Sequence, residues 1–466
     1  MFNIKIKDIV NATGGKLLCG NEDVEITNFC TNSSKAAKGL MFLPIIGERV
    51  DGHKYIPSAF LCGAEASMTS SYEAVMDMIS EWEQNASCKP VVLVEDSVKA
   101  LQDVARYYEK TLSLMKVGVT GSVGKTTTKE MIACALSASL NVFKTAGNAN
   151  SQIGVPVTLM DIMPENEAAV IEMGMSEEGE MQKLAKLLSL NAVAMTNIGV
   201  SHIEQLKTQE NILKEKWHIT DALSDGGFVF LNGNDKLLRK KAEEEKAKGK
   251  FKVYTYGTTP DCDYYAENIK AENDGVKFLA VCEGRQIDVS LKVLGEHNVL
   301  NALVAIAVAD KLGVSIKKAA EALADYEGVA MRGQVTIKNG VTYIDDSYNA
   351  SPDSMKAGLN VLTQTKGKRK IAVLADMLEL GENTAIYHRQ VGEYIANTDV
   401  EELIVYGELA KNIADGARKY VKNIHAFSTH KEIIDYLLDT VVCGDVILFK
   451  GSRGMKLNEV VEYFLK

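Results

Sequence analysis

The chain has 466 residues and a formal net charge of −10 at pH 7, and 46% of its residues are hydrophobic and 24% charged. This length predicts roughly three domains of about 150 residues each, and the composition is typical of a soluble globular protein. The acidic balance argues against a protein that binds nucleic acid by neutralising phosphates, and the lack of any run of about 18 apolar residues argues against membrane insertion.

The first part of the chain, residues 1–96, predicts a small α/β domain. It mixes short strand patterns, glycine-rich turns and helices, and it ends in a strand pattern at residues 90–94. The first residues show no signal-peptide pattern. The eight cysteines of the chain include no C-x-x-C pair, which is typical of reduced thiols in a cytoplasmic protein.

Residues 97–328 predict a central parallel sheet with crossover helices. Helical patterns lie at residues 98–110 and 126–140, and a charged stretch at residues 239–252 predicts a solvated helix. Buried strands are predicted at residues 116–120, 168–173, 191–197 and 228–231. Apolar runs separated by helical patterns are typical of a parallel sheet.

After residue 328, strand and helix patterns alternate regularly, which predicts a Rossmann-like open parallel sheet for residues 329–466. Strands are predicted at residues 342–345, 370–374, 402–406 and 445–449, and helices are predicted to begin near residues 352, 384, 408, 430 and 455. Ligands bind beyond the carboxyl ends of the strands in such sheets. Asp346, Asp376 and Lys450 each follow a predicted strand, so this edge is a candidate functional face.

The strand at residues 116–120 runs into a glycine-rich loop, GVTGSVGKTTT at residues 118–128. Glycines let the main chain curl so that its N–H groups face a polyphosphate, Lys125 adds positive charge, and Thr126 offers a hydroxyl to Mg²⁺. The helix that follows directs its N-terminal dipole at the same anion. The strict phosphate-loop spacing has a glycine where this chain has Val119, so the match is to a variant. The predicted nucleotide-binding residues of the loop are Gly121, Ser122, Val123, Gly124, Lys125, Thr126 and Thr127.

The alternative interpretation is a glycine-rich turn that contains a lysine by chance, and the strand before the loop and the helix after it argue against this. The chain has no Asn-Lys dipeptide, which small GTPases use to read guanine. A kinase or ligase is therefore favoured over a guanine nucleotide switch. The central domain is predicted to be a P-loop ATPase-type parallel sheet.

Together these motifs resemble the Mur ligase family of ATP-dependent enzymes, which add amino acids to the peptidoglycan precursor. Besides the phosphate loop, the central strings that carry the resemblance are TAGNANSQIGVP at residues 145–156, EMG at 172–174, NIGVSHIE at 197–204 and GEHNVLNA at 295–302. The third-domain strings DDSYNASPDSM at residues 345–355, LADMLELG at 374–381 and KGSRGM at 450–455 resemble those of the last ligase of this family.

The resemblance implies an ATP-dependent acid–D-amino-acid ligase that joins D-alanyl-D-alanine to UDP-N-acetylmuramoyl-tripeptide through an acyl phosphate. It implies ATP and two Mg²⁺ ions as cofactors, and these two peptides as small-molecule substrates. A cytoplasmic monomer of three domains is expected. Residues 1–96 would bind the UDP-sugar, residues 97–328 would bind ATP, and residues 329–466 would form the ligase domain.

The catalytic residues implied by the resemblance are Lys125, Glu172, His202, Lys216 and Arg332. Glu172 would hold Mg²⁺ together with Thr126, because hard oxygen ligands suit that ion; a helix-capping carboxylate is the alternative. His202 would face the metal. Arg332 would reach the phosphates when the third domain closes, and this closure would exclude water from the acyl phosphate.

Lys216 matches the position at which the family carries a carbamylated lysine, a carboxylate-like group that can bridge a metal. From the residues alone, Lys216 and Lys214 would both be solvated lysines of an amphipathic helix. The family usually has a glutamate two places after this lysine, where the present chain has His218. The implied metal ligands are Thr126, Glu172, His202 and Lys216.

Asn298 and Asn301 lie three residues apart on one face of a predicted helix, and their amides match the donor and acceptor groups of adenine. Asp346 is placed to accept hydrogen bonds from the ribose, and Tyr348 to lie against the base, with a core aromatic as the alternative. The implied substrate-binding residues are Ser33, Asp51, Asn148, Asn150, Asn349, Lys450 and Arg453. The Asp-Ser-Arg string of the family appears here as Asn32-Ser33-Ser34, which removes charged contacts expected near the uridine diphosphate.

Two other functions stay open. One is a related Mur-type ligase that acts on another peptide or makes polyglutamyl folate, although the third-domain strings and the full N-terminal domain argue against folate. The other is a paralogue that binds nucleotide or UDP-sugar without turnover, which the departures at Asn32, Ser34 and His218 favour.

Overall fold

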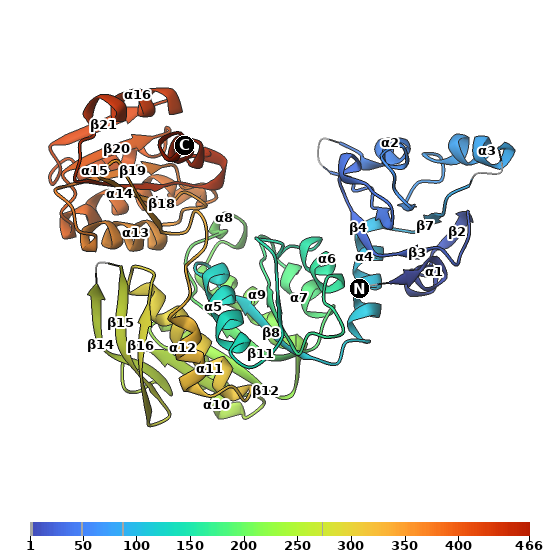
Figure 1. Ribbon diagram of the computed structural model, residues 1–466, viewed down its shortest axis with the longest axis horizontal. Coiled ribbons are helices and arrows are strands. Elements are labelled where there is room, and N and C mark those ends of the chain that lie inside the picture. Colours follow the sequence, from blue (N-terminus) through green and yellow to red (C-terminus); the bar gives the residue numbers. More distant parts are fainter. Residues whose placement is uncertain (1–2, 48–49, 86–87, 273) are drawn as a thin grey trace.

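The computed structural model describes residues 3–47, 50–85, 88–272 and 274–466. It consists of three α/β bodies, each with its own large sheet, which follow one another from blue to red in Figure 1. We call them the N-terminal body (strands within residues 16–93), the central body (strands within 115–291) and the C-terminal body (strands within 334–450). A small additional sheet pairs β1 (Ile4–Lys5) with β3 (Glu25–Ile26). The predicted α/β class is confirmed.

The N-terminal body holds a five-stranded sheet in the order β2-β7-β6-β5-β4. Its strands are β2 (Lys16–Cys19), β4 (Asn28–Cys30), β5 (Leu40–Phe42), β6 (Ala66–Thr69) and β7 (Val91–Leu93). Helices α2 (Ile56–Leu61) and α3 (Met76–Gln84) pack on one face, and α1 (Ile6–Thr13) packs on the other. Helix α4 (Ser97–Glu109) buries Leu101 and Val104 in a core that continues into the central body, so this helix joins the two bodies.

The central body is a nine-stranded sheet in the order β16-β15-β14-β13-β12-β11-β8-β10-β9. Its parallel part consists of β8 (Met115–Thr120), β9 (Val142–Lys144), β10 (Ala168–Glu172), β11 (Leu190–Met195), β12 (Leu223–Asn232) and β13 (Lys252–Gly257). The four strands predicted here are confirmed as β8, β10, β11 and β12. Their nearly continuous apolar sequences reflect burial on both faces.

Neither edge of the central sheet was predicted: β9 was missed on one side, and β13 and the strands beyond it were missed on the other. The strands β14 (Tyr264–Glu272), β15 (Gly275–Cys282) and β16 (Arg285–Leu291) form an antiparallel meander that extends the sheet beyond β13. In β14 the buried residues Tyr264 and Ala266 alternate with accessible ones, and in β16 the buried residues Val289 and Leu291 do the same. This pattern is typical of an antiparallel sheet with one wet face, and β14 and β16 lack the apolar runs on which the predicted strands rested.

Helices cover both faces of the central sheet. Helices α5 (Lys125–Ser137), α11 (His297–Lys311) and α12 (Ile316–Leu323) share one core with β8 and β10. Helices α6 (Gly154–Met160), α7 (Glu180–Ala185), α9 (Gln209–Trp217) and α10 (Lys236–Lys248) pack on the opposite face. The helix predicted for the charged stretch at residues 239–252 is confirmed as α10, although it ends at Lys248 and β13 begins at Lys252. Helix α11 is buried on nearly all sides, because it packs on the sheet with α5 and α12 beside it.

The C-terminal body is a six-stranded sheet in the order β17-β18-β22-β19-β20-β21. Its strands are β17 (Gln334–Lys338), β18 (Val341–Asp346), β19 (Arg369–Ala375), β20 (Glu402–Tyr406), β21 (Asn423–Phe427) and β22 (Asp445–Lys450). Helices α13 (Pro352–Gln364), α14 (Thr384–Tyr394) and α15 (Lys411–Ala417) cover one face, and α16 (His430–Thr440) and α17 (Asn458–Leu465) the other. The four predicted strands are confirmed; the edge strands β17 and β21 were missed.

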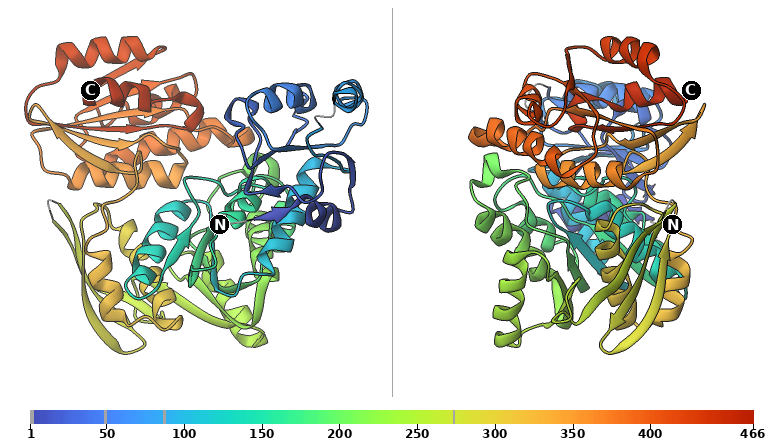
Figure 2. Two further views of the ribbon diagram at one scale, coloured as in Figure 1. Left: turned by 45° about the vertical axis from the view of Figure 1, so that its right-hand side comes forward. Right: turned by 90° about the vertical axis from the view of Figure 1, so that its left-hand side faces the viewer.

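The C-terminal body lies over the central body, and the N-terminal body lies on the same side of it, as the two views of Figure 2 show. None of the helices in the described ranges is long and apolar enough to span a bilayer. The carboxyl ends of β8 and β10 are adjacent because these strands pair in parallel, and those of β18 and β22 are adjacent for the same reason. These two sheet edges border the cavity described next.

Candidate active site

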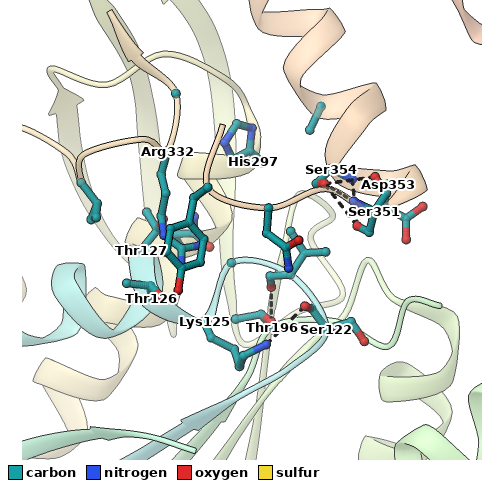
Figure 3. A pocket seen from close by; sticks show the side chains of 18 of the residues that line it. Ser122, Lys125, Thr126, Thr127, Thr196, His297, Arg332, Ser351, Asp353 and Ser354 are labelled. Carbon is teal, nitrogen blue, oxygen red and sulfur yellow. Dashed lines mark hydrogen bonds between the residues drawn. The ribbon is translucent and has the colours of Figure 1, made fainter. Parts of the chain in front are cut away.

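A cavity of about 530 Å³ lies between the central and C-terminal bodies. Its volume is in the range of sites for nucleotide-sized ligands. The central body contributes the loop after β8, the ends of β10 and β11 and the start of α11; the C-terminal body contributes the ends of β18 and β22 and the start of α13. Figure 3 shows Lys125 and Ser122 facing the same space as Ser354 and Asp353.

The predicted phosphate loop curls as its glycines allow. Gly121 and Gly124 have φ angles of 148° and 85°, which favour glycine. A Cβ atom on Gly121 would come within 1.9 Å of the Thr196 hydroxyl oxygen, so the loop is pressed against the end of β11. Helix α5 begins directly after Gly124, which leaves its first N–H groups without helical partners and directed at the cavity.

Two residues that were not predicted as site residues fix this loop. Thr196 donates a hydrogen bond from its hydroxyl to the Val123 carbonyl oxygen at 2.5 Å, and the Val123 N–H donates to Asn197 Oδ1 at 2.8 Å. Both residues follow β11, the strand beside β8. Their position at the carboxyl end of the strand predicted at residues 191–197 was the signal that could have identified them.

Lys125 is partly buried and turns back onto its own loop. Its ammonium donates to the carbonyl oxygens of Gly121 at 2.8 Å and Ser122 at 3.3 Å. Burial lowers the pKa of Lys125, the Glu172 carboxylate opposes this shift, and the Arg332 guanidinium adds to it. A polyphosphate in the cavity would supply the anion that this ammonium lacks.

Arg332 already lines the cavity in this structure. Its guanidinium stands 4.0 Å from the centroid of the Tyr348 ring, in a cation–π arrangement. Tyr348 therefore supports Arg332 here, and its predicted contact with the nucleotide base stays a prediction. Figure 3 shows Arg332 above Thr126 and Thr127 at the start of α5.

Glu172 is almost fully buried at the end of β10. Its carboxylate accepts hydrogen bonds from the Thr126 hydroxyl at 2.8 Å and from the Asn150 amide at 2.7 Å, and its own N–H donates to the Thr145 hydroxyl at 3.0 Å. The structure thus brings together Thr126, Glu172 and Asn150, three residues predicted for metal and substrate binding. It does not use Glu172 as a helix cap.

His202 lines the cavity, but it is engaged elsewhere. Its Nδ1 lies 2.8 Å from Glu379 Oε2 of the C-terminal body, and this partner lowers the pKa of Glu379. His202 and Glu379 both have positive φ angles, 62° in each case. In this arrangement His202 joins the two bodies and does not contact Glu172.

Lys216 is 1% exposed, which corrects the expectation from the residues alone that it is solvated; Lys214 is exposed as expected. Burial lowers the pKa of Lys216 well below its usual value, nearby Lys125 lowers it further, and Glu215 opposes the shift. His218, where the resemblance implies a glutamate, places its Nδ1 2.7 Å from Asp221 Oδ2.

The asparagines predicted to read adenine are hydrogen-bonded to each other. The Thr128 hydroxyl donates to Asn301 Oδ1 at 2.9 Å, the Asn301 amide donates to Asn298 Oδ1 at 3.0 Å, and the Asn298 amide donates to the Leu294 carbonyl oxygen at 2.8 Å. This chain of bonds ties α11 to α5. Both asparagines line the cavity, and each amide keeps one further N–H.

The residues predicted at the strand ends of the C-terminal body form an ion pair. Lys450 Nζ lies 2.6 Å from Asp346 Oδ2 and 3.1 Å from the Asn349 carbonyl oxygen, and all three residues line the cavity. Asp376 does not line it; its carboxylate accepts from the Ala410 N–H at 2.7 Å near the start of α15.

Of the predicted substrate-binding residues, Asn148 and Asn150 line the cavity, while Ser33, Asp51 and Arg453 do not. Asp51 accepts hydrogen bonds from the N–H of His53 at 2.9 Å and lies 2.6 Å from the His53 ring nitrogen Nδ1. Ser33 lies in the N-terminal body beside Asn32, which accepts from the Ser34 N–H at 3.0 Å.

Known proteins resemble this chain over nearly its whole length. The Mur ligase family catalytic domain matches residues 25–109, the Mur ligase middle domain matches 119–309, and the Mur ligase glutamate ligase domain matches 331–453. The chain is 34% identical to the UDP-N-acetylmuramoyl-tripeptide–D-alanyl-D-alanine ligase of Bacillus subtilis, over 99% of this chain and 98% of that protein. It is similar in structure to MurF from Acinetobacter baumannii (TM-score 0.89, 27% identity, 99% of each chain). It is also similar to MurF from Thermotoga maritima in complex with ADP (TM-score 0.81, 28% identity, 94% and 96% of the two chains).

Proposed function

The chain belongs to the Mur ligase family, and we propose that it uses ATP to join D-alanyl-D-alanine to UDP-N-acetylmuramoyl-tripeptide in peptidoglycan precursor synthesis. One observation carries the proposal. A single cavity holds Lys125 of the phosphate loop together with Asp346 and Lys450, which come from the third-domain strings typical of this ligase. The nucleotide and the acceptor peptide can therefore bind in the same cavity.

In the first step, a carboxylate of the tripeptide attacks the γ-phosphorus of ATP, an acyl phosphate forms, and ADP leaves. Two anions must approach each other, so positive charge has to be concentrated where they meet. Lys125 supplies it from the phosphate loop and Arg332 from the segment before β17, and both line the cavity. The N–H groups at the start of α5 add to this positive potential.

The oxygen atoms of Thr126 and Glu172 fit a Mg²⁺ ion. They lie 2.8 Å apart at the cavity wall, and Mg²⁺ prefers oxygen ligands and completes its shell with water and substrate phosphates. No group of three or more His, Cys, Asp or Glu side chains suited to a metal occurs within the described ranges, so these further ligands would be needed. When bound, the ion would polarise the phosphate oxygens.

We extend the proposal to a second metal site formed by carbamylated Lys216 and His202. A carbamate forms when a neutral amine attacks CO₂ and loses a proton, and the lowered pKa of the buried Lys216 amine favours its neutral form. His202 would have to leave Glu379, its partner at 2.8 Å, to serve as a ligand.

In the second step, the amine of D-alanyl-D-alanine attacks the acyl carbonyl carbon, the amide bond forms, and phosphate leaves. The acyl phosphate must be protected from water during this step. The C-terminal body closes one side of the cavity with the start of α13 and the Asp346–Lys450 pair. We propose that Asn148 and Asn150 hold the sugar side of the substrate, and that Ser33 and Asp51 of the N-terminal body meet its UDP part.

The proposal is tested with the purified chain, ATP, Mg²⁺, UDP-N-acetylmuramoyl-tripeptide and D-alanyl-D-alanine. Phosphate release that requires both peptides, with one amide formed per phosphate, is the expected result. Phosphate release with a different peptide acceptor or with folate would indicate a related ligase. Tight nucleotide binding without turnover of any acceptor would indicate the non-catalytic paralogue that Asn32, Ser34 and His218 left open.

A further inference from the structure

Lys129 is a buried lysine that no step of the proposed reaction uses. It lies one turn after Lys125 on α5, and its side chain is fully buried. Its ammonium contacts the Thr145 carbonyl oxygen at 2.6 Å, the Gly147 carbonyl oxygen at 3.4 Å and Glu130 Oε1 at 2.8 Å. An ammonium has three N–H donors, so these partners use all of them. Lys129 therefore has no donor left for a ligand.

The two carbonyl partners belong to residues 145–150, a segment that contacts the end of β10. At one end of this segment, the Thr145 hydroxyl accepts from the Glu172 N–H at 3.0 Å. At the other end, the Asn150 amide donates to the Glu172 carboxylate at 2.7 Å, and the Gly174 N–H donates to the Asn150 carbonyl oxygen at 2.9 Å. This segment therefore carries Asn148 and Asn150, and Asn150 helps Thr126 to hold the Glu172 carboxylate.

The charge on Lys129 is balanced within the protein. Partial burial raises the pKa of Glu130, but hydrogen bonds from Lys129 and Lys144 lower it further, and the net shift is downward. A buried ammonium is costly unless it is paired and hydrogen-bonded, and both conditions are met here. Such an arrangement fixes the positions of its partners, because any movement of residues 145–147 would leave a buried charge with an unsatisfied donor.

We propose that Lys129 is a positioning residue that holds residues 145–150 against the phosphate-loop helix and thereby aligns Asn148 and Asn150 with the nucleotide site. One helix then positions both the nucleotide site and residues 145–150, since α5 begins at Lys125 and carries Lys129 one turn later. The identity of the substrate that this segment meets rests on the proposed function; the contact between Lys129 and the segment does not.

The kinetic test compares Lys129→Gln and Lys129→Arg with Lys144→Gln in the full-length chain. Lys144 is the matched control, because it pairs with the same Glu130 from an exposed position and does not reach residues 145–150. We expect Lys129→Gln to raise the KM for the UDP-tripeptide roughly 10- to 100-fold, with a much smaller change in the KM for ATP. Lys129→Arg is expected to recover part of this loss, and Lys144→Gln to behave like the parent. A fall in kcat with both KM values unchanged would indicate a purely structural lysine and would overturn the proposal.

Hydrogen–deuterium exchange of the unliganded chain tests the contact without any turnover. Lys129→Gln should speed exchange across residues 145–150 while peptides of the C-terminal body keep the exchange of the parent. If Lys129→Gln does not fold, Lys129→Met, which also removes the ammonium, is measured in its place. Unchanged exchange across residues 145–150 would overturn the proposal, even if the chain is an active ligase. Faster exchange in a chain that does not join the two peptides would support the positioning role of Lys129 and contradict only the proposed function.

Discussion

The Thr126 hydroxyl donates a 2.8 Å hydrogen bond to the Glu172 carboxylate, from the first turn of α5 to the end of β10. The two residues meet because β8 and β10 are parallel neighbours, with Glu172 paired in register with Val119. The phosphate loop and the carboxylate therefore leave the sheet at the same edge. A hydroxyl and a carboxylate at this separation can share one cation, which is the basis of the magnesium site proposed above.

Glu172→Gln should keep the shape of the side chain but remove its negative charge. Magnesium binding should weaken, and kcat should fall by roughly 100-fold or more, since a bound ion contributes several kcal/mol to the transition state of phosphoryl transfer. The measurement is the rate of phosphate release as a function of Mg²⁺ concentration.

Glu177→Gln is the control for this experiment, because Glu177 is an exposed carboxylate a few residues further along. The magnesium dependence of Glu177→Gln should match that of the parent. An unchanged magnesium dependence in Glu172→Gln would show that the ion, if one is needed, is held by other residues.

Lys125→Ala should abolish turnover without lowering stability. Among the described residues, the ammonium donates to two carbonyl oxygens of its own loop, and burial lowers its pKa, so the empty site stabilises its charge poorly. We expect kcat to fall by roughly 100-fold or more, as when one preorganised group is removed from a developing charge. The melting temperature without nucleotide should be equal to or above that of the parent. Normal turnover in this variant would show that the loop is not catalytic.

The sequence was sufficient to predict the features that depend on local patterns. The phosphate loop, with Gly121 and Gly124 at its bends, needs only a buried strand before it and a helix after it. The same holds for the four strands of the C-terminal sheet, whose apolar runs are short and clearly separated. The side chains at their ends, Asp346 and Lys450, could then be assigned to one edge from topology alone.

Features that depend on packing between distant segments could not be predicted. Lys216 lies on a short helix whose other charged residues suggest solvent exposure, and it is buried because neighbouring elements cover it. Glu215 accepts a hydrogen bond from the Met181 N–H at 2.9 Å, which fixes α7 over α9. The contact between His202 and Glu379 depends on how two bodies dock, and no local sequence pattern encodes that.

Lys216→Ala should lose activity that added short carboxylic acids partly restore, since acetate or formate can take the place of the carbamate. The parent should lose activity in CO₂-free buffer and regain it with bicarbonate. Lys214→Ala, which changes an exposed lysine of the same helix, should show neither effect. If Lys216→Ala is as active as the parent, the proposed carbamate has no role in the reaction.

The stability of the uncarbamylated chain should depend on pH through Lys216. Burial lowers the pKa of this lysine in the folded chain well below its usual value of 10.5, so between these two values the unfolded chain binds more protons. The free energy of unfolding therefore rises with pH across this window, by up to about 1.4 kcal/mol per pH unit for one group, and falls as pH drops through it. Urea denaturation in CO₂-free buffer from pH 7 to 10 measures the slope. Lys216→Met should have a smaller slope than the parent, and Lys214→Met an unchanged one.

Gly121→Ala should disrupt the phosphate loop itself. At a φ of 148° the residue adopts a conformation that favours glycine, and the added Cβ would lie 1.9 Å from the Thr196 hydroxyl oxygen. The loop must move, which would break the bond from Thr196 to the Val123 carbonyl oxygen. We expect a loss of about 1–3 kcal/mol in stability and a marked loss of ADP affinity by calorimetry.

Gly179→Ala is the control for this experiment. Gly179 also has a positive φ, 82°, but no atom lies within 4 Å of its added Cβ, so this variant should show a similar conformational cost with normal ADP affinity. Equal ADP binding by both variants would mean that the curl of this loop does not form the nucleotide site.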